Sequence, residues 1–256
     1  MPVPGQVMNP ESIEAAALTY LSDGWPISAY MARPRLPGPR PAILVLEEIF
    51  GVNEHIRDVV RRFAAAGFIA LAPEIFSRVG SPKPGEPIEA ILARAVSLPD
   101  SQIVRDLDRG AALLARHGTN GKLGCVGFCL GGRNALLYAC GGGRVNATID
   151  CWGGYILNAT VTEKTTASRP TPVADMVGNL RGALYVVCGE EDKNPSPEQA
   201  AELSGRLRNA GKRATVEAFK NAGHAFFADY RPNYRPEAAA ELWPKMLSFF
   251  GTNLHD

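Results

Sequence analysis

The sequence lacks an excess of charge of either sign. Its 27 lysines and arginines almost balance 26 aspartates and glutamates, which leaves a formal net charge of +1 at pH 7. No block of like charges stands out either, so the chain offers no basic surface of the kind that attracts nucleic acid or an anionic membrane. We therefore expect neither a nucleic acid nor a membrane among its partners.

Long hydrophobic runs are also missing. The longest uninterrupted apolar runs fall far short of the roughly 18 residues needed to cross a bilayer. The first residues, Met1–Gln6, contain no basic segment followed by an apolar core, so they do not form a secretory signal. The sequence predicts a soluble, cytoplasmic protein. A chain of 256 residues can form one sizeable domain, and we expect a single domain over residues 1–256, as a monomer or a small homo-oligomer.

The cysteines do not form a recognisable framework. There are five of them, an odd number, with no CxxC pair and no cysteine–histidine spacing that suits zinc. We therefore expect no metal site and no cofactor. Three cysteines lie in apolar, strand-like runs and one lies at a helix end, and these four are expected to be buried thiols in a reducing compartment: Cys125, Cys151, Cys188 and Cys140.

Apolar strand-like runs alternate with amphipathic helical runs along nearly the whole chain. The expected strands are Ile27–Ala32, Ala42–Leu46, Ile69–Ala72, Leu123–Gly127, Ala147–Trp152, Ala183–Cys188 and Thr215–Phe219. The expected helices are Glu54–Ala66, Ser101–His117, Gly131–Cys140, Pro197–Ala210 and Pro236–Phe250. The pattern predicts an α/β fold with a mostly parallel, doubly wound sheet flanked by helices on both faces. Two loops rich in small or polar residues, Gly80–Pro87 and Asn158–Met176, are expected near the active-site edge.

The segment Gly127–Gly132 indicates a nucleophile. It follows an apolar strand and precedes a helix, which is the layout of the nucleophile elbow, a sharp turn that raises one side chain over the edge of a sheet. The usual G-x-S-x-G reads G-x-C-x-G here, so Cys129 replaces the serine, and no serine in the chain lies in such a motif. A buried thiol that merely fits beside glycine is the alternative. The helix that follows favours the nucleophile, because its free N–H groups stabilise a thiolate and a developing oxyanion.

A base and an acid follow in the order expected for such a nucleophile. Of the four histidines, His224 lies between the last expected strand and the last helix, where an α/β-hydrolase places its base. Three acids, Glu190, Glu191 and Asp192, directly follow the preceding strand, and Asp192 lies far enough beyond the strand to reach back to an imidazole. The chain order Cys129, Asp192, His224 predicts a catalytic triad.

Together these residues resemble the dienelactone hydrolase (carboxymethylenebutenolidase) family of the α/β-hydrolase superfamily. Four blocks carry the resemblance: Leu46–Asn53, Ala72–Arg78, Gly127–Gly132 and Gly223–Phe227. They extend from about one fifth to nine tenths of the chain. The E-I-F-G sequence in the first block, combined with G-F-C-x-G-G, is specific to the family rather than general to hydrolases.

The resemblance assigns further roles by position. Glu48, the glutamate of E-I-F-G, would lie near the thiol and hold or release its proton, which would make Cys129 less oxidisable at rest. The backbone N–H groups of Ile49 and Leu130 would form the oxyanion hole. Arg78 matches the first arginine that reads a substrate carboxylate, with a solvated loop arginine as the alternative. The resemblance places a second carboxylate-reading arginine four residues after His224, where this chain has Ala228 instead.

The sequence thus predicts hydrolysis of a lactone or small carboxylic ester through a thioester, with a dienelactone-type substrate favoured. A generalist carboxylesterase or lactonase without a carboxylate preference is one alternative, supported by Ala228. A non-catalytic protein whose thiol senses oxidants is another, although the complete triad argues against it. Trp152 and Tyr155 are expected either to line the substrate pocket or to pack in the core.

Overall fold

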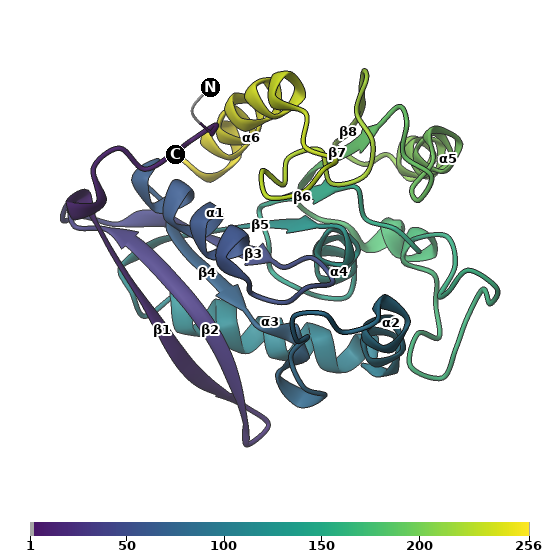
Figure 1. Cartoon of the computed structure of the whole chain (residues 1–256), viewed down its shortest axis with the longest axis horizontal. Coiled ribbons are helices and arrows are strands. Elements are labelled where there is room, and N and C mark those ends of the chain that lie inside the picture. The colour runs from purple at the N-terminus through teal and green to yellow at the C-terminus, as the bar shows by residue number, and fades with distance from the viewer. Residues whose placement is uncertain (1–2, 256) are drawn as a thin grey trace.

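The computed structural model describes residues 3–255 and has one eight-stranded sheet at its centre (Figure 1). The strands are β1 (Ile13–Ser22), β2 (Trp25–Pro34), β3 (Arg40–Leu46), β4 (Ile69–Pro73), β5 (Thr119–Phe128), β6 (Ala147–Cys151), β7 (Ala183–Gly189) and β8 (Ala214–Phe219). Their spatial order is β1-β2-β4-β3-β5-β6-β7-β8. All neighbouring pairs from β4 to β8 are parallel. The pairs β1–β2 and β2–β4 are antiparallel, so only β2 runs against the direction of the other strands. The predicted α/β-hydrolase fold with a mostly parallel sheet is confirmed.

Helices cover both faces of the sheet. They are α1 (Glu54–Ala65), α2 (Ile88–Ser97), α3 (Asp100–Leu114), α4 (Leu130–Cys140), α5 (Pro197–Asn209) and α6 (Pro236–Leu254), with 3-10 helices at Pro10–Ser12, Ile75–Arg78 and Val173–Asn179. One core layer packs α1 and α6 against the sheet through an aromatic cluster that includes Phe63, Trp243 and Phe250. The other packs α3, α4 and α5 against the opposite face. The central strands are buried on both sides, which explains their continuously apolar sequences.

Two elements lie outside the predicted set. Strand β1 is an edge strand, and most of its middle residues are exposed, so its sequence lacks a clear alternation of apolar and polar residues. It is joined to β2 by Asp23 and Gly24, both at positive φ, which is the usual two-residue hairpin turn. The dipeptide Asp-Gly was the sequence signal for this hairpin.

The second is α2, which directly follows the expected loop Gly80–Pro87. Its apolar residues Ile88, Ile91, Leu92, Ala95 and Val96 fall at positions i, i+3, i+4, i+7 and i+8, which is the helical period. The expected loop Asn158–Met176 also differs from the structure at its end, because a 3-10 helix, Val173–Asn179, begins within it.

Candidate active site

Cys129 lies on a sharp turn between β5 and α4. Its backbone has φ 57° and ψ −116°, a strained conformation for a residue with a side chain, costing of the order of 1–3 kcal/mol. The turn is possible because glycine flanks it. A Cβ at Gly127 would lie 1.8 Å from the carbonyl oxygen of Gly131, and a Cβ at Gly131 would lie 2.3 Å from that of Leu46. The two glycines therefore let α4 start directly above the strand ends, with Cys129 at its first turn.

Asp192 and His224 meet beside this turn. Asp192 follows β7, His224 follows β8, and a backbone hydrogen bond from the Glu191 N–H to Ala222 O (2.9 Å) holds the two loops together. The Nδ1 atom of His224 lies 2.9 Å from Oδ2 of Asp192. The other carboxylate oxygen of Asp192 accepts the N–H of Asn194 at 3.0 Å, so the side chain is fixed from both sides.

The charge of His224 is set by its partners. Burial by itself lowers the pKa of the ring, but hydrogen bonds to Asp192 and Cys129 outweigh it and raise the pKa to about 10. The ring therefore carries a proton at neutral pH. The stability that this proton contributes is fully present below the ordinary value of 6.5 and is lost as the pH rises toward 10.

A cavity of about 310 Å³ lies above Cys129, Asp192 and His224. The apolar face of α2 forms one wall, and the loops after β3, β6, β7 and β8 form the others. The lining residues are Ile49, Phe50, Ile88, Leu92, Ala95, Val96, Cys129, Leu130, Gly154, Tyr155, Arg169, Asp192, Lys193, Asn194, His224 and Arg231. This size and this mixture of apolar walls with a few polar groups suit a small organic ligand.

The two residues expected to supply the oxyanion hole both line this cavity. Leu130 is the first residue of α4, where a backbone N–H has no partner within the helix. Ile49 lies in the loop between β3 and α1 and is mostly buried. Their role as donors to an oxyanion stays a prediction.

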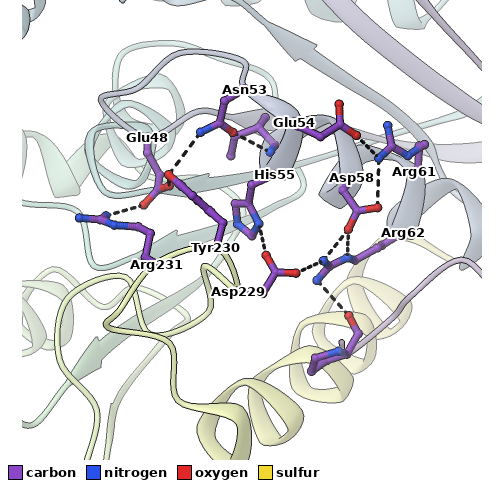
Figure 2. A network of polar contacts seen from close by, with 12 residues as sticks. Glu48, Asn53, Glu54, His55, Asp58, Arg61, Arg62, Asp229, Tyr230 and Arg231 are labelled. Atoms are coloured by element: carbon purple, nitrogen blue, oxygen red, sulfur yellow. Dashed lines mark hydrogen bonds and ion pairs between the residues drawn. The ribbon is translucent and has the colours of Figure 1, made fainter. Parts of the chain in front are cut away.

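Glu48 is buried and belongs to a polar network that joins its loop and residues 229–231 to α1 (Figure 2). One carboxylate oxygen accepts the hydroxyl hydrogen of Tyr230 at 2.9 Å, and the other accepts from Nη1 of Arg231 at 3.1 Å. The neighbouring Asp229 is held in turn by His55 at 2.9 Å and by Arg62 at 3.1 Å. The expected contact between Glu48 and the thiol therefore stays a prediction, because both carboxylate oxygens are occupied in this arrangement.

The structure corrects the placement of Arg78. Its Nε and Nη2 each lie 2.8 Å from one carboxylate oxygen of Asp106, and Nη2 also donates to Ser22 O at 2.9 Å. This bidentate pair neutralises the guanidinium, and Arg78 is not among the residues lining the cavity. Asp106 lies on α3, and no motif in the sequence points to this pairing.

The two aromatic candidates separate. Tyr155 lines the cavity, and its N–H donates to Oδ1 of Asn194 at 3.3 Å. Trp152 is 1% exposed and is not among the lining residues; its ring packs 4.7 Å from that of Phe226 and 5.9 Å from that of Phe128. Trp152 is therefore a core residue. Tyr155 thus belongs to the wall of the pocket, and Trp152 to the core.

Three cationic residues of the cavity were missed as site residues: Arg169, Lys193 and Arg231. Arg231 lies three residues beyond Ala228, and its guanidinium reaches the cavity although the motif position does not match. Arg169 comes from the irregular segment between β6 and β7, and Lys193 follows Asp192. No sequence signal distinguishes them, because isolated cations in loops are usually solvated.

A model of the dienelactone hydrolase family matches residues 27–254 of this chain, which include the turn at Cys129, the cavity and both triad loops. The chain belongs to the dienelactone hydrolase family. It is 37% identical over 248 residues to "Putative carboxymethylenebutenolidase" of Escherichia coli (strain K12), covering 95% of this chain and 89% of that protein. Its family is one of carboxylic ester hydrolases that act on lactones or esters.

Two further relatives extend this result. The chain is 32% identical over 228 residues to "Probable 2-oxo-3-(5-oxofuran-2-ylidene)propanoate lactonase" of Bradyrhizobium sp, covering 88% of this chain and 89% of that protein. The crystal structure of a "Putative Dienelactone Hydrolase" from Klebsiella pneumoniae subsp. pneumoniae MGH 78578 superposes with a TM-score of 0.87 at 34% identity, covering 93% of this chain and 98% of that one. Sequence and fold thus agree on the family.

Among residues 3–255, no helix is both long enough and apolar enough to span a bilayer.

Proposed function

We propose that this protein hydrolyses a lactone or small carboxylic ester with Cys129 as nucleophile, His224 as proton donor and acceptor, and Asp192 as the group that orients His224. One observation carries the proposal. A thiol on a strained turn at a helix N-terminus shares a cavity with an imidazole that lies 2.9 Å from a buried carboxylate. This is the arrangement that activates a nucleophile and keeps its base in one orientation.

In the first half of the reaction, the Cys129 thiolate attacks the substrate carbonyl. The N–H groups of Ile49 and Leu130 stabilise the tetrahedral oxyanion. As the C–O bond to the leaving group breaks, the protonated His224 gives its proton to the departing oxygen, which leaves a thioester on Cys129 and a neutral imidazole. The raised pKa of His224 supports this step, because it ensures that the proton is present at neutral pH.

In the second half, the neutral His224 removes a proton from water while that water attacks the thioester. The C–S bond then breaks, the acid product leaves, and the thiolate and the protonated imidazole are restored. Asp192 keeps Nδ1 of the ring engaged throughout, so that Nε2 is the nitrogen that exchanges the proton. No metal or cofactor is needed for this cycle.

For the substrate, we favour a lactone or ester that also bears a carboxylate, of the dienelactone type. Apolar side chains make up most of the cavity wall, and its three cations lie among them. The Bradyrhizobium relative is named for a substrate that combines a lactone ring with a carboxylate. A generalist esterase is the second candidate, and the pairing of Arg78 with Asp106 favours it because it removes one expected carboxylate reader.

The cytoplasm remains the proposed location. All five cysteines are unpaired, and four of them are buried. Unpaired cysteines are the rule where the cell keeps thiols reduced.

Replacement of the nucleophile tests the proposed function. Cys129→Ala is expected to lower the turnover of p-nitrophenyl acetate by at least about a thousandfold, because it removes the thiolate that attacks the carbonyl. Cys140→Ala, at the other end of α4, is the matched control and should keep most of the activity. Circular dichroism checks that both variants fold. A Cys129→Ala variant that is folded and retains more than a few per cent of the activity would overturn the proposal.

A further inference from the structure

The three cations that line the cavity differ in how free they are to bind an anion. Lys193 is exposed, so water and salt screen its charge. Arg231 is paired with the buried carboxylate of Glu48, with Nη1 and Oε1 3.1 Å apart. Arg169 is 1% exposed and lines the same cavity from the segment between β6 and β7. Only Arg169 is both shielded from solvent and without an acidic partner among residues 3–255.

The hydrogen bonds of Arg169 fix its position without neutralising it. Nη2 donates to Ala95 O at 2.8 Å, and Nη1 donates to Ala159 O at 3.2 Å. Ala95 lies in the last turn of α2, where backbone carbonyls lack partners within the helix. A guanidinium has five N–H donors, and its Nε has no hydrogen-bond partner here. The side chain is thus held rigidly with unused donors.

Asp100, the acid whose negative charge acts on Arg169, is already paired with another arginine. Asp100 binds Arg133 through both carboxylate oxygens, at 2.8 and 2.9 Å. The cluster of Asp100, Arg133 and Arg169 therefore keeps one positive charge that nothing in it balances. Burial and the neighbouring Arg133 lower the pKa of Arg169 to about 10. Both disfavour the charged form of the guanidinium, which nevertheless stays protonated at neutral pH. A buried, unbalanced charge of this kind is costly unless an anion joins it.

We propose that Arg169 is a specificity-determining residue that binds the carboxylate of the substrate in the cavity of Cys129. Ala95, whose carbonyl oxygen accepts from Arg169, and Val96 both line the cavity from α2, so the substrate chain between ester and carboxylate would run along an apolar wall. The catalytic part rests on the proposed function, whereas binding of a carboxylate at Arg169 does not.

A pair of esters that differ only in charge tests the catalytic part. Mono-p-nitrophenyl pimelate carries a terminal carboxylate on a chain too long for rapid attack on its own ester, and its carboxamide counterpart is neutral with the same shape. The wild-type enzyme should prefer the anionic ester in kcat/KM, and Arg169→Gln should lower that preference at least about tenfold, the usual weight of a charge-assisted hydrogen bond. Arg169→Lys keeps the charge without the fork and should retain part of the preference.

Binding is measured separately, without turnover. The rate at which iodoacetamide alkylates Cys129 is followed with increasing hexanoate or hexanamide. Hexanoate should protect the wild-type thiol at concentrations at least about tenfold lower than hexanamide, and Arg169→Gln should abolish the difference. This measurement needs only a thiol in the cavity, so it stands even if the ester is not hydrolysed through Cys129.

Two variants serve as controls. Lys193→Gln removes the exposed cation of the same cavity, and Arg94→Gln removes a cation of α2 that pairs with Glu86 outside it. Both should leave the preference for the anionic ester nearly unchanged. Equal loss of activity toward both esters in Arg169→Gln would show a purely structural role, and a preference that depends on Lys193 would place the carboxylate elsewhere. If Arg169→Gln does not fold, equal protection of the wild-type thiol by hexanoate and hexanamide overturns the proposal by itself.

Discussion

Glu47 and Glu48 are consecutive residues with opposite electrostatic surroundings. The side chain of Glu48 is bound by a cation and a hydroxyl group. At Glu47, burial and the nearby carboxylate of Glu74 raise the side-chain pKa well above its ordinary value, while the Ile75 N–H that Glu47 accepts at 2.7 Å lowers it less. Glu74 in turn accepts the Val52 N–H at 3.0 Å. Glu47 and Glu74 thus connect the loop that contains Ile49 and Val52 to the chain just after β4.

The raised pKa of Glu47 makes a prediction for stability. A raised carboxyl pKa means that the folded state holds its proton more tightly than the unfolded state, so this group's contribution is full at low pH and falls as the pH rises from 4.5 toward the raised value. Glu47→Gln keeps the acceptor for Ile75 but cannot ionise. It should match the wild type near pH 4 and exceed it near pH 8 by at least about 1 kcal/mol in the free energy of unfolding.

Urea unfolding at both pH values checks this, and groups that do not interact with Glu47 cancel because each variant is compared with the wild type at the same pH. A difference between the two proteins that does not change with pH would mean that Glu47 titrates normally.

At the scale of elements, the turn formed by residues 229–231 is held against α1. Asp229 binds His55 and Arg62 of α1, and the Tyr230 hydroxyl accepts from Nδ2 of Asn53 at the start of that helix, at 3.2 Å (Figure 2). The same turn carries Tyr230 and Arg231, which bind Glu48. Helix α1 therefore positions Tyr230 and Arg231, the residues that bind the Glu48 carboxylate in the described part of the chain. No residue of α1 is among those lining the cavity.

Asp229→Asn should loosen this turn. The expected loss in the free energy of unfolding is about 1–3 kcal/mol, because hydrogen bonds to the buried Arg62 and to His55 are weakened. Hydrogen exchange of the amides of residues 229–231 should become faster. Glu54→Gln, which removes an exposed partner of Arg61 on the same helix, is the control and should cost less than about 1 kcal/mol. Equal losses in the two variants would show that the turn is not held by Asp229.

At the scale of the whole molecule, the fold was largely predictable from the sequence. The seven predicted strands and five predicted helices are present within a few residues, because buried parallel strands and amphipathic helices each leave a strong pattern. Strand β1 is absent from the prediction because an edge strand need not alternate, and α2 is absent because residues 88–97 are assigned to no element, although their apolar residues follow the helical period. The cavity depends on α2, so this omission hid one wall of the site.

The site was predictable where backbone geometry dictates residue type. Cys129, Asp192 and His224 come together because a strand–turn–helix unit and the loops after β7 and β8 meet at one edge of the sheet. The arginines were not predictable in the same way. Whether Arg78 meets Asp106, and whether Arg169 meets any acid, depends on residues far apart in the chain, and a single sequence does not show such pairings.

Chemical trapping of the acyl intermediate tests the central claim most directly. The enzyme is mixed with p-nitrophenyl acetate, quenched in acid within milliseconds to seconds, and analysed by intact and peptide mass spectrometry. The thioester mechanism predicts one acetyl group on Cys129 and an early release of p-nitrophenol up to one equivalent per active site. An early release of p-nitrophenol without an acyl group on Cys129, or with the acyl group on another residue, would contradict it.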